Sequence, residues 1–343
     1  MSNCCNSSIA HVDSGLTRKD RLGMFMCRIS NRRRSNYVVD PGLYAVGSPG
    51  NLSPIFVSAN YKFSFDILRL SVRGIDCYIL VLDTKGVNVW CAAGKGTFGT
   101  DELVSRIKST QLADAVQHRR IIVPQLGAVG VAGYEVKERT GFTVVFGPVD
   151  AKDIPEFLNS KMKATKEMRR IRFNWKDRIV LTPMELVPAS KWIFLILAVL
   201  FILGGLDRSG ILFRPAFEAL KYTGTALLAG LVCGGFLGPL LLPLLPFRSF
   251  ALKGLFIGLL YPIVLSAAFF PSDEENIFLF AAACIAAPAI SSYITVNFTG
   301  SSTVTGISGV EKELKTAMPL YKASAVAVSI LVLVGLFKNW AFF

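Results

Sequence analysis

The segment DCYILVLDTKGVNVWCAAGKG (residues 76–96) decides the fold of the first half of the chain. Residues 76–83 form a short run whose middle is apolar, as in a buried parallel strand. Asn88 is a favourable helix N-cap, so a short helix should begin there and place Cys91 in its first turn. Free backbone N–H groups and the helix dipole favour a thiolate at that position.

The neighbours of Cys91 are small. Lys95 follows four residues later and shares a helix face with Cys91, while Gly94 leaves that face open. Small neighbours allow a large, flat ligand to approach the sulfur. The segment therefore predicts a soft metal centre carried by a planar cofactor.

Outward from this segment, short strands rich in Val, Ile and Phe alternate with helical patterns. The order predicts an open, Rossmann-like α/β domain with a parallel sheet and right-handed crossovers. The expected strands cover 53–59, 77–83, 119–123 and 142–147, and the expected helices cover 63–72, 100–110, 129–139 and 150–160.

Ligands of such sheets bind beyond the carboxyl ends of the strands. The candidate residues at these ends are Asn60, Thr84, Gly127 and Gly147. The glycine-rich stretch that includes Ala128 and Gly130 does not fit the GxGxxG dinucleotide pattern, and the Gly94-Lys95 pair lacks the remainder of a phosphate-binding loop. These glycines are expected to let the backbone approach the cofactor.

The chain as a whole is too apolar for an ordinary soluble protein. Hydrophobic residues make up 52% of the 343 residues, and the mean hydropathy is +0.48. The long apolar runs all follow Lys191 and are long enough to cross a bilayer. They predict an all-α domain of five transmembrane helices near 191–206, 216–236, 250–270, 277–298 and 319–337.

The net charge of +13 comes partly from clusters outside these runs. We expect residues 1–40 to be a polar basic tail, 41–165 the cytosolic cofactor domain, 166–190 a basic juxtamembrane linker and 191–343 the membrane domain. Basic residues beside a span mark the cytoplasmic side and attract anionic lipid, which explains the charge better than nucleic-acid binding. The protein is thus expected in the inner membrane of a prokaryote as a multi-pass protein.

Seven cysteines, at positions 4, 5, 27, 77, 91, 233 and 284, show no CxxC pair and no four-cysteine pattern. We expect free thiols in a reducing compartment and no iron-sulfur cluster in this chain. Electrons for a low-potential centre would then come from another protein.

The helix segment resembles the cap-helix motif of the mercury-methylating corrinoid protein family, HgcA. The likeness continues through most of residues 39–158, including 39–44, 59–62, 82–86 and 96–103. The cytosolic part is also similar to the large subunit of the corrinoid iron-sulfur protein of acetyl-CoA synthesis, which has no membrane segments. The matching motif consists of Asn88, Val89, Trp90, Cys91, Ala92, Ala93, Gly94 and Lys95.

The resemblance implies a cobalamin-type corrinoid with the Cys91 thiolate as lower axial ligand of the cobalt. A donating thiolate favours release of methyl with carbanion character, here to Hg(II), giving methylmercury. The family also implies a ferredoxin-like iron-sulfur reductant and a methyl donor from the methyltetrahydrofolate pathway. In the family, Asn88 fixes the approach of the cap helix to the corrin.

Other interpretations stay open. Cys91 can be an inert buried cysteine, Trp90 core filler and Lys95 a solvated cation. The loop 299–311 resembles a segment of the family's membrane domain and either starts a helix with a Ser308–Glu311 capping box or receives a metal ion or partner. The whole chain could instead carry methyl to another acceptor, as in acetyl-CoA synthesis, or be a membrane transporter or scaffold with a ligand-sensing domain.

Overall fold

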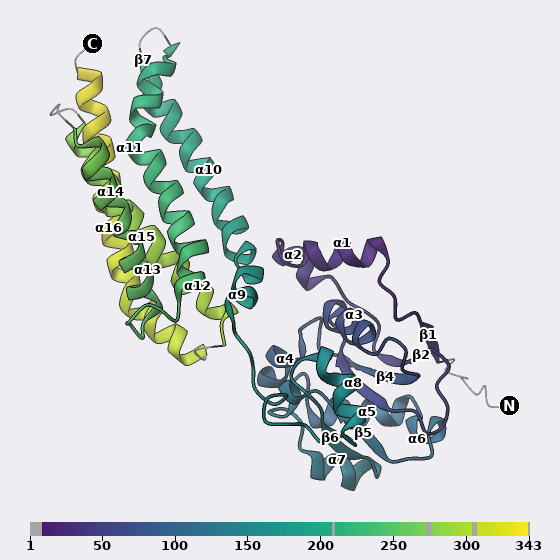
Figure 1. Ribbon diagram of the computed structural model, residues 1–343. Helices are drawn as coiled ribbons and strands as arrows, with labels where there is room; N and C mark the ends of the chain where they lie inside the picture. The colour runs from purple at the N-terminus through teal and green to yellow at the C-terminus, as the bar shows by residue number, and fades with distance from the viewer. Residues whose placement is uncertain (1–8, 208–209, 272–275, 304–306, 342–343) are drawn as a thin grey trace. The chain divides into compact units, whose positions relative to one another are not determined.

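The computed structural model describes residues 9–207, 210–271, 276–303 and 307–341. The chain forms two compact units, Met1–Ile171 and Arg172–Phe343. The first is built around a sheet and the second consists mainly of long helices (Figure 1). An α/β domain is therefore followed by a helical region, as the sequence predicts.

The first unit contains a six-stranded sheet in the order β1-β2-β4-β3-β5-β6. The four predicted strands are all present, and β4, β3, β5 and β6 run parallel to one another. The sheet is mixed, however, because β2 pairs with β4 in the antiparallel direction. The prediction of a purely parallel sheet was wrong on this point. The strands are β1 Ala10–Val12, β2 Gly42–Val46, β3 Ile55–Ala59, β4 Cys77–Leu82, β5 Arg120–Val123 and β6 Thr143–Phe146.

Residues 1–40 were expected to be a polar tail, but from Ala10 onward the chain is folded. It contributes β1, which pairs with β2, and the helices α1 (Arg18–Met26) and α2 (Asn31–Ser35). A strand of three residues is too short to show an alternating pattern, and α1 buries no side chain fully. The hydrophobic pattern therefore gives no sign of these elements, and the polar composition alone predicted a tail.

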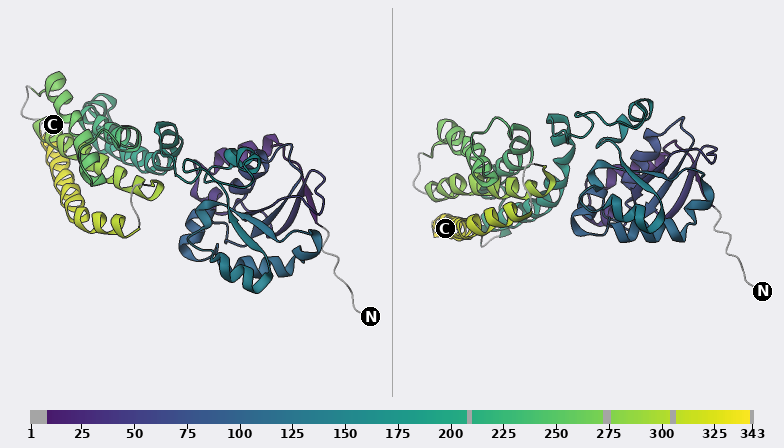
Figure 2. Two further views of the ribbon diagram at one scale, coloured as in Figure 1. Left: turned by 60° about the horizontal axis from the view of Figure 1, so that its bottom comes forward. Right: turned by 90° about the horizontal axis from the view of Figure 1, so that it is seen from below.

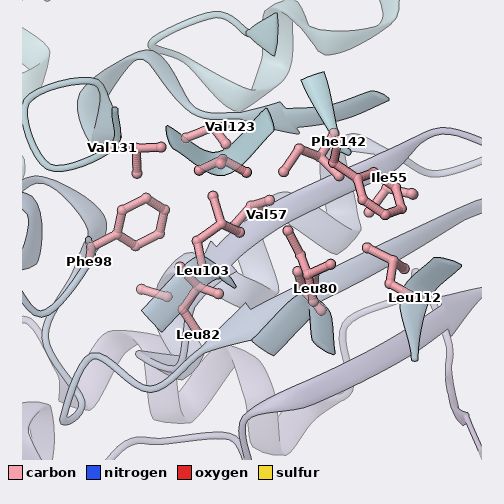
Figure 3. Close-up of a cluster of buried hydrophobic side chains, with 14 of the residues drawn as sticks. Ile55, Val57, Leu80, Leu82, Phe98, Leu103, Leu112, Val123, Val131 and Phe142 are labelled. Atoms are coloured by element: carbon pink, nitrogen blue, oxygen red, sulfur yellow. The ribbon is translucent and has the colours of Figure 1, made fainter. Parts of the chain in front are cut away.

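Helices cover both faces of the sheet. One core cluster joins Val57, Leu80 and Val123 to helices α4 to α7, and Figure 3 shows its buried side chains meeting between strands and helices. A second cluster joins alternate strand residues, such as Phe56 and Ile79, to α3 and α8. The helices are α3 Lys62–Ser71, α4 Val89–Lys95, α5 Thr100–Ser109, α6 Leu112–Ala115, α7 Gly133–Thr140 and α8 Ile154–Asn159, with short 3-10 turns η1 Gln125–Gly127 and η2 Ala151–Asp153.

A network of charged side chains attaches α1 to α3. Asp20 accepts from Lys62 Nζ at 2.6 Å and from Arg69 Nη2 at 2.8 Å, and both cations also contact the buried Asp66. Partial burial by itself raises the pKa of the Asp20 carboxyl, but hydrogen bonds from Lys62, Thr17 and Arg69 outweigh it and hold the pKa well below its usual range. The ionised form thus stabilises the docking of α1.

We expect Asp20→Asn to loosen α1. Because folding lowers the pKa of the Asp20 carboxyl, the ionised group stabilises the folded state at a pH above its unfolded-state pKa of about 4. This stabilisation is lost as the pH falls from that value through the folded-state pKa. At pH 7, amide hydrogen exchange in residues 18–26 should be about tenfold faster in the variant, equivalent to about 1.4 kcal/mol. The difference from the wild type should shrink below pH 4. Asp114→Asn, at an exposed position, is the control, and equal exchange in both variants would contradict the assignment.

The second unit contains five helical stretches long and apolar enough to cross a membrane: Trp175–Gly205, Phe213–Leu241, Phe250–Ala268, Ile277–Gly300 and Gly309–Phe337. Five spans were predicted, and this number is confirmed within the described residues. The helices are α9 Trp175–Leu181, α10 Pro183–Gly205, α11 Phe213–Val232, α12 Gly238–Leu241, α13 Phe250–Gly258, α14 Leu260–Phe269, α15 Ile277–Asn297 and α16 Ile307–Ala341; a π turn, η3 Cys233–Leu237, a 3-10 turn, η4 Phe298–Ser301, and the strands β7 Leu206–Asp207 and β8 Gly210–Ile211 complete the unit.

Helix α15 contacts α11, α13 and α16 and so forms the centre of this unit, whose helices run beside one another in the two views of Figure 2. Small residues permit close approach. A Cβ on Gly254 would lie 2.7 Å from Ser291 O, and one on Gly258 would lie 2.6 Å from Pro288 Cα. Ser291 Oγ donates to Gly254 O at 2.7 Å. Glycine pairs four residues apart with cross-helix serine bonds are typical of packing within a bilayer.

Three expectations for the helical half differ in detail from the structure. The first long helix, α10, begins at Pro183 rather than at Lys191, and α9 precedes it within the expected linker. The proline-rich segment 238–246, which the sequence predicts to be a cytoplasmic turn or an interfacial segment, begins with α12. Helix α16 begins at Ile307, so Ser308 already lies inside the helix, and the hydrogen bond that would define its capping box falls outside the described residues.

Candidate functional site

The predicted cap helix is α4. Asn88 is its N-cap, and the Asn88 Oδ1 accepts from Cys91 N at 2.9 Å. The helix ends at Gly96, whose φ of 80° lies in the left-handed region that glycine adopts without strain. Both the helix and the position of Cys91 in its first turn are confirmed.

One face of α4 is buried and the other is exposed. Val89, Ala92 and Ala93 pack into the core of the first unit. The opposite face presents Trp90, Cys91, Gly94 and Lys95, and Trp90 is 42% exposed. The three residues predicted to share a face therefore do so.

Cys91 is an exposed residue. A Cβ added at Gly94 would meet nothing within 4 Å, so the space beside the thiol on the next turn is open. Cys91 is thus not the inert buried cysteine that remained possible from sequence. The exposed side chains of this face are those that a flat ligand above the helix would touch.

The loop before α4 depends on two residues from strand ends. Asn60, after β3, accepts at its Oδ1 from Thr84 N at 3.1 Å and from Gly86 N at 2.9 Å. The Thr84 hydroxyl lies 2.9 Å from the same oxygen and 2.6 Å from Val87 O, and donates to one of them. Both residues are buried. Their polar atoms hold the loop that delivers α4, so they position the site from below it.

We expect Asn60→Ala to displace this loop. The substitution leaves the N–H groups of Thr84 and Gly86 without an acceptor, at a cost of about 1–3 kcal/mol. Hydrogen exchange of residues 84–96 should accelerate by at least about tenfold. Asn51→Ala, on the exposed loop before β3, is the matched control and should leave the exchange of these residues unchanged. An Asn60→Ala protein with wild-type exchange here would disprove the positioning role.

The glycines after β5 support the cap helix. A Cβ on Gly130 would lie 2.2 Å from Phe98 O and 3.2 Å from Ala93 Cα, and one on Gly127 would lie 2.5 Å from the Phe98 ring. A Cβ on Gly147 would lie 3.0 Å from Ile122 Cγ2. These glycines were expected to let the backbone approach the cofactor. In the structure, the space beside them is filled by other atoms of the protein. Ala128 is half-buried in the same loop.

Sequence reasoning missed a second support of the loop. Glu102 Oε1 accepts from Asp83 N at 2.9 Å and pairs with Arg106 at 2.8 Å. A hydrogen bond from Lys85 is the largest cause that lowers the pKa of the Asp83 carboxyl. In the sequence, Glu102 with Thr100 and Asp101 only indicates the start of the helix expected at 100–110. Its place in the 96–103 part of the family likeness was the available hint.

Two hollows in the first unit lie away from the cap helix. One of about 360 Å³ is lined by residues such as Gln111, Glu138 and Phe142, and another of about 220 Å³ by Pro54, His118 and others. Both are near the amino ends of strands, where ligands of such sheets are uncommon. Neither of these hollows includes the cap-helix face.

The comparisons with known proteins concern this first unit. Residues 28–158 match the family model described as CO dehydrogenase/acetyl-CoA synthase delta subunit. The acetyl-CoA decarbonylase/synthase complex subunit gamma of Methanopyrus kandleri is 33% identical over 125 residues, 36% of this chain and 27% of that relative. The corresponding subunit of Methanocaldococcus jannaschii is 32% identical over 148 residues, 42% of this chain and 28% of the relative.

The corrinoid/iron-sulfur protein large subunit of Moorella thermoacetica is 29% identical over 126 residues, which are 36% of this chain and 28% of that subunit. The chain therefore spans little more than a quarter of the length of these curated relatives. The matched range contains the sheet and the cap helix. The first unit is accordingly a corrinoid-protein-like domain, and it is followed by a helical unit of the multi-pass membrane type.

Proposed function

We propose that the protein is a membrane-anchored, corrinoid-dependent methyltransferase that transfers methyl to inorganic Hg(II). Cys91 would serve as the lower axial ligand of the cobalt. The observation that carries the proposal is the exposed Cys91 on a cap helix whose outer face is otherwise open at Gly94. Likeness of residues 28–158 to corrinoid proteins supports the cofactor.

The residues present fit a corrinoid. A soft thiolate is a suitable donor to a transition metal, and the open space at Gly94 leaves room for a planar ring. Trp90 and Lys95 flank the sulfur on the exposed face and would meet the ring edge or its polar substituents. When bound, the corrinoid would supply a methyl group held on cobalt.

The chain itself contributes positioning. Asn88 fixes the first turn of α4 and so the direction of the Cys91 side chain. Asn60 and Thr84 hold the preceding loop, and Gly130 allows its own loop to lie against the backbone of Phe98 and of Ala93 in α4. This arrangement presents one cysteine sulfur in a fixed orientation, as the supporting residues around a metal ligand commonly do.

The acceptor and the partners rest on the resemblance to the mercury-methylating family. We propose Hg(II) as substrate, a ferredoxin-like iron-sulfur protein as reductant and a methyl donor from the methyltetrahydrofolate pathway. The five long apolar helices support a place in a membrane. We propose that the first unit lies in the cytoplasm of a prokaryote, as the basic residues before the first span predict.

The second candidate is a methyl carrier for a different acceptor. It is favoured by the names of the relatives, which belong to acetyl-CoA decarbonylase/synthase complexes. The five candidate spans favour the membrane methyltransferase instead. The sequence resemblance to the large subunit of the corrinoid iron-sulfur protein implies a methyl carrier without membrane segments.

Single-turnover methyl transfer separates these candidates. The full chain in detergent is loaded with a methylcorrinoid and mixed with nanomolar Hg(II), and methylmercury is measured by mass spectrometry. We expect the bound cofactor to react at least about tenfold faster than the same concentration of free methylcorrinoid, equivalent to 1.4 kcal/mol of barrier. A bound rate no higher than the free rate would reject mercury as the substrate.

A further inference from the structure

A short helix precedes the first long helix of the second unit. Helix α10 has 23 residues and spans about 34 Å at 1.5 Å per residue, which exceeds the hydrocarbon thickness of about 30 Å. Thr182 separates it from α9, and Pro183, the first residue of α10, cannot donate the hydrogen bond that would continue α9. Helix α9 is therefore not needed for the crossing and belongs at the level of the lipid headgroups.

Arg178 lies within α9 and is only 9% exposed. Its Nη1 donates to Phe173 O at 3.3 Å, but its Nε is buried and has no hydrogen-bond partner among the described residues. The surroundings are apolar, since Phe173 and Leu181 pack on a cluster with Phe298 and Leu242. A buried charged donor without an acceptor costs at least about 1–3 kcal/mol. An anion with several acceptor oxygens would remove this cost.

The surface around Arg178 is basic and carries an exposed aromatic residue. Arg172 and Lys176 are exposed, and Trp175 is 54% exposed with Lys176 Nζ 5.5 Å from its ring centroid. The acidic residue of α9, Asp177, accepts from Asn174 N at 2.9 Å as part of the capping box. Its carboxylate is thus engaged at the start of the helix.

We propose that α9 binds the phosphate of an anionic phospholipid, with Arg178 as the buried contact and Arg172 and Lys176 as surface contacts. Tryptophan at the headgroup level and a basic juxtamembrane segment are both typical of anionic-lipid recognition. Arg178 distinguishes this site from a general excess of positive charge, since a buried guanidinium offers directed donors rather than a diffuse field.

The test uses the full chain in nanodiscs of phosphatidylcholine containing phosphatidylglycerol, released in the mass spectrometer to count retained lipids. We expect phosphatidylglycerol to be retained over phosphatidylcholine, and Arg178→Gln to reduce its affinity about tenfold. Arg214→Gln, at an exposed position of α11, removes the same charge and should change retention little. The Arg172→Gln, Lys176→Gln double variant alters only exposed side chains and should weaken retention without affecting the fold.

Three outcomes would overturn the proposal. One is equal retention of the two lipids by the wild type, and another is equal loss in Arg178→Gln and Arg214→Gln. The third is displacement of phosphatidylglycerol by millimolar inorganic phosphate, which would identify a free-anion site. Circular dichroism of Arg178→Gln checks its helix content. If that variant does not fold, Arg178→Lys and the double variant decide the question.

Discussion

Replacing Cys91 with alanine should abolish methyl transfer while the protein still folds and enters the membrane. The side chain is exposed, so the substitution leaves no cavity in the core and removes no packing. It does remove the sulfur donor. We expect single-turnover methyl transfer to fall at least about 1000-fold, equivalent to about 4 kcal/mol. Measurement of methylmercury formed by equal amounts of membrane-inserted wild type and variant checks the result.

Cys91→His separates ligation from other roles of the thiol. Imidazole is also a metal donor, so this variant should retain part of the bound corrinoid while losing most turnover. Cys284→Ala, a cysteine of the helical unit, is the control and should behave as the wild type. Methyl transfer by Cys91→Ala at the wild-type rate would falsify the ligand assignment.

Gly94→Ala should raise stability and lower corrinoid affinity. Gly94 lies inside α4, and a Cβ there meets nothing within 4 Å, so alanine should favour the helix by about 0.5–1 kcal/mol. The same methyl group would project from the face that carries Cys91, where a ring bound to the sulfur has to lie. We expect corrinoid affinity at least about tenfold weaker, or about 1.4 kcal/mol. Hydrogen exchange of residues 89–95 and cofactor titration measure the two effects.

Gly130→Ala is the matched substitution on the buried side of the same helix. Its Cβ would lie 2.2 Å from Phe98 O, so the cap helix or the loop must shift, at a cost of about 1–3 kcal/mol. Exchange in α4 should then accelerate and affinity should fall with it. If Gly94→Ala bound the corrinoid as tightly as the wild type, the cofactor would not lie on the Cys91 face.

The parallel strands and the cap helix were predictable because their signals are local. A continuous apolar run such as residues 77–82 can be recognised in one segment, and Asn88 marks a helix start by its own side chain. The strand β2 was missed because only its pairing with β4 reveals it. The docking of α1 likewise depends on Asp20, Lys62 and Arg69, which lie far apart in sequence.

At the site, too, the features set by local sequence were predictable and those set by distant contacts were not. Cys91, Gly94 and Lys95 lie on one face because helix periodicity dictates it. The roles of Asn60 and Gly130 could not be read in advance, since the first depends on bonds to residues 84–86 and the second on the backbone of Phe98. The sequence places Asn60 at a strand end and Gly130 in a glycine-rich stretch and assigns both to the cofactor, whereas their contacts in the structure are with the loop and helix that carry Cys91.

The absorption spectrum of the purified full-length protein tests the central claim most directly. We expect a corrinoid band in the wild type at a position that differs from that of free cobalamin, and a shift or loss of that band in Cys91→Ala. The Gly94→Ala spectrum should show less bound cofactor in the same coordination. A corrinoid band identical in wild type and Cys91→Ala, or a loaded wild-type protein that retains no corrinoid, would contradict the bond between Cys91 and cobalt.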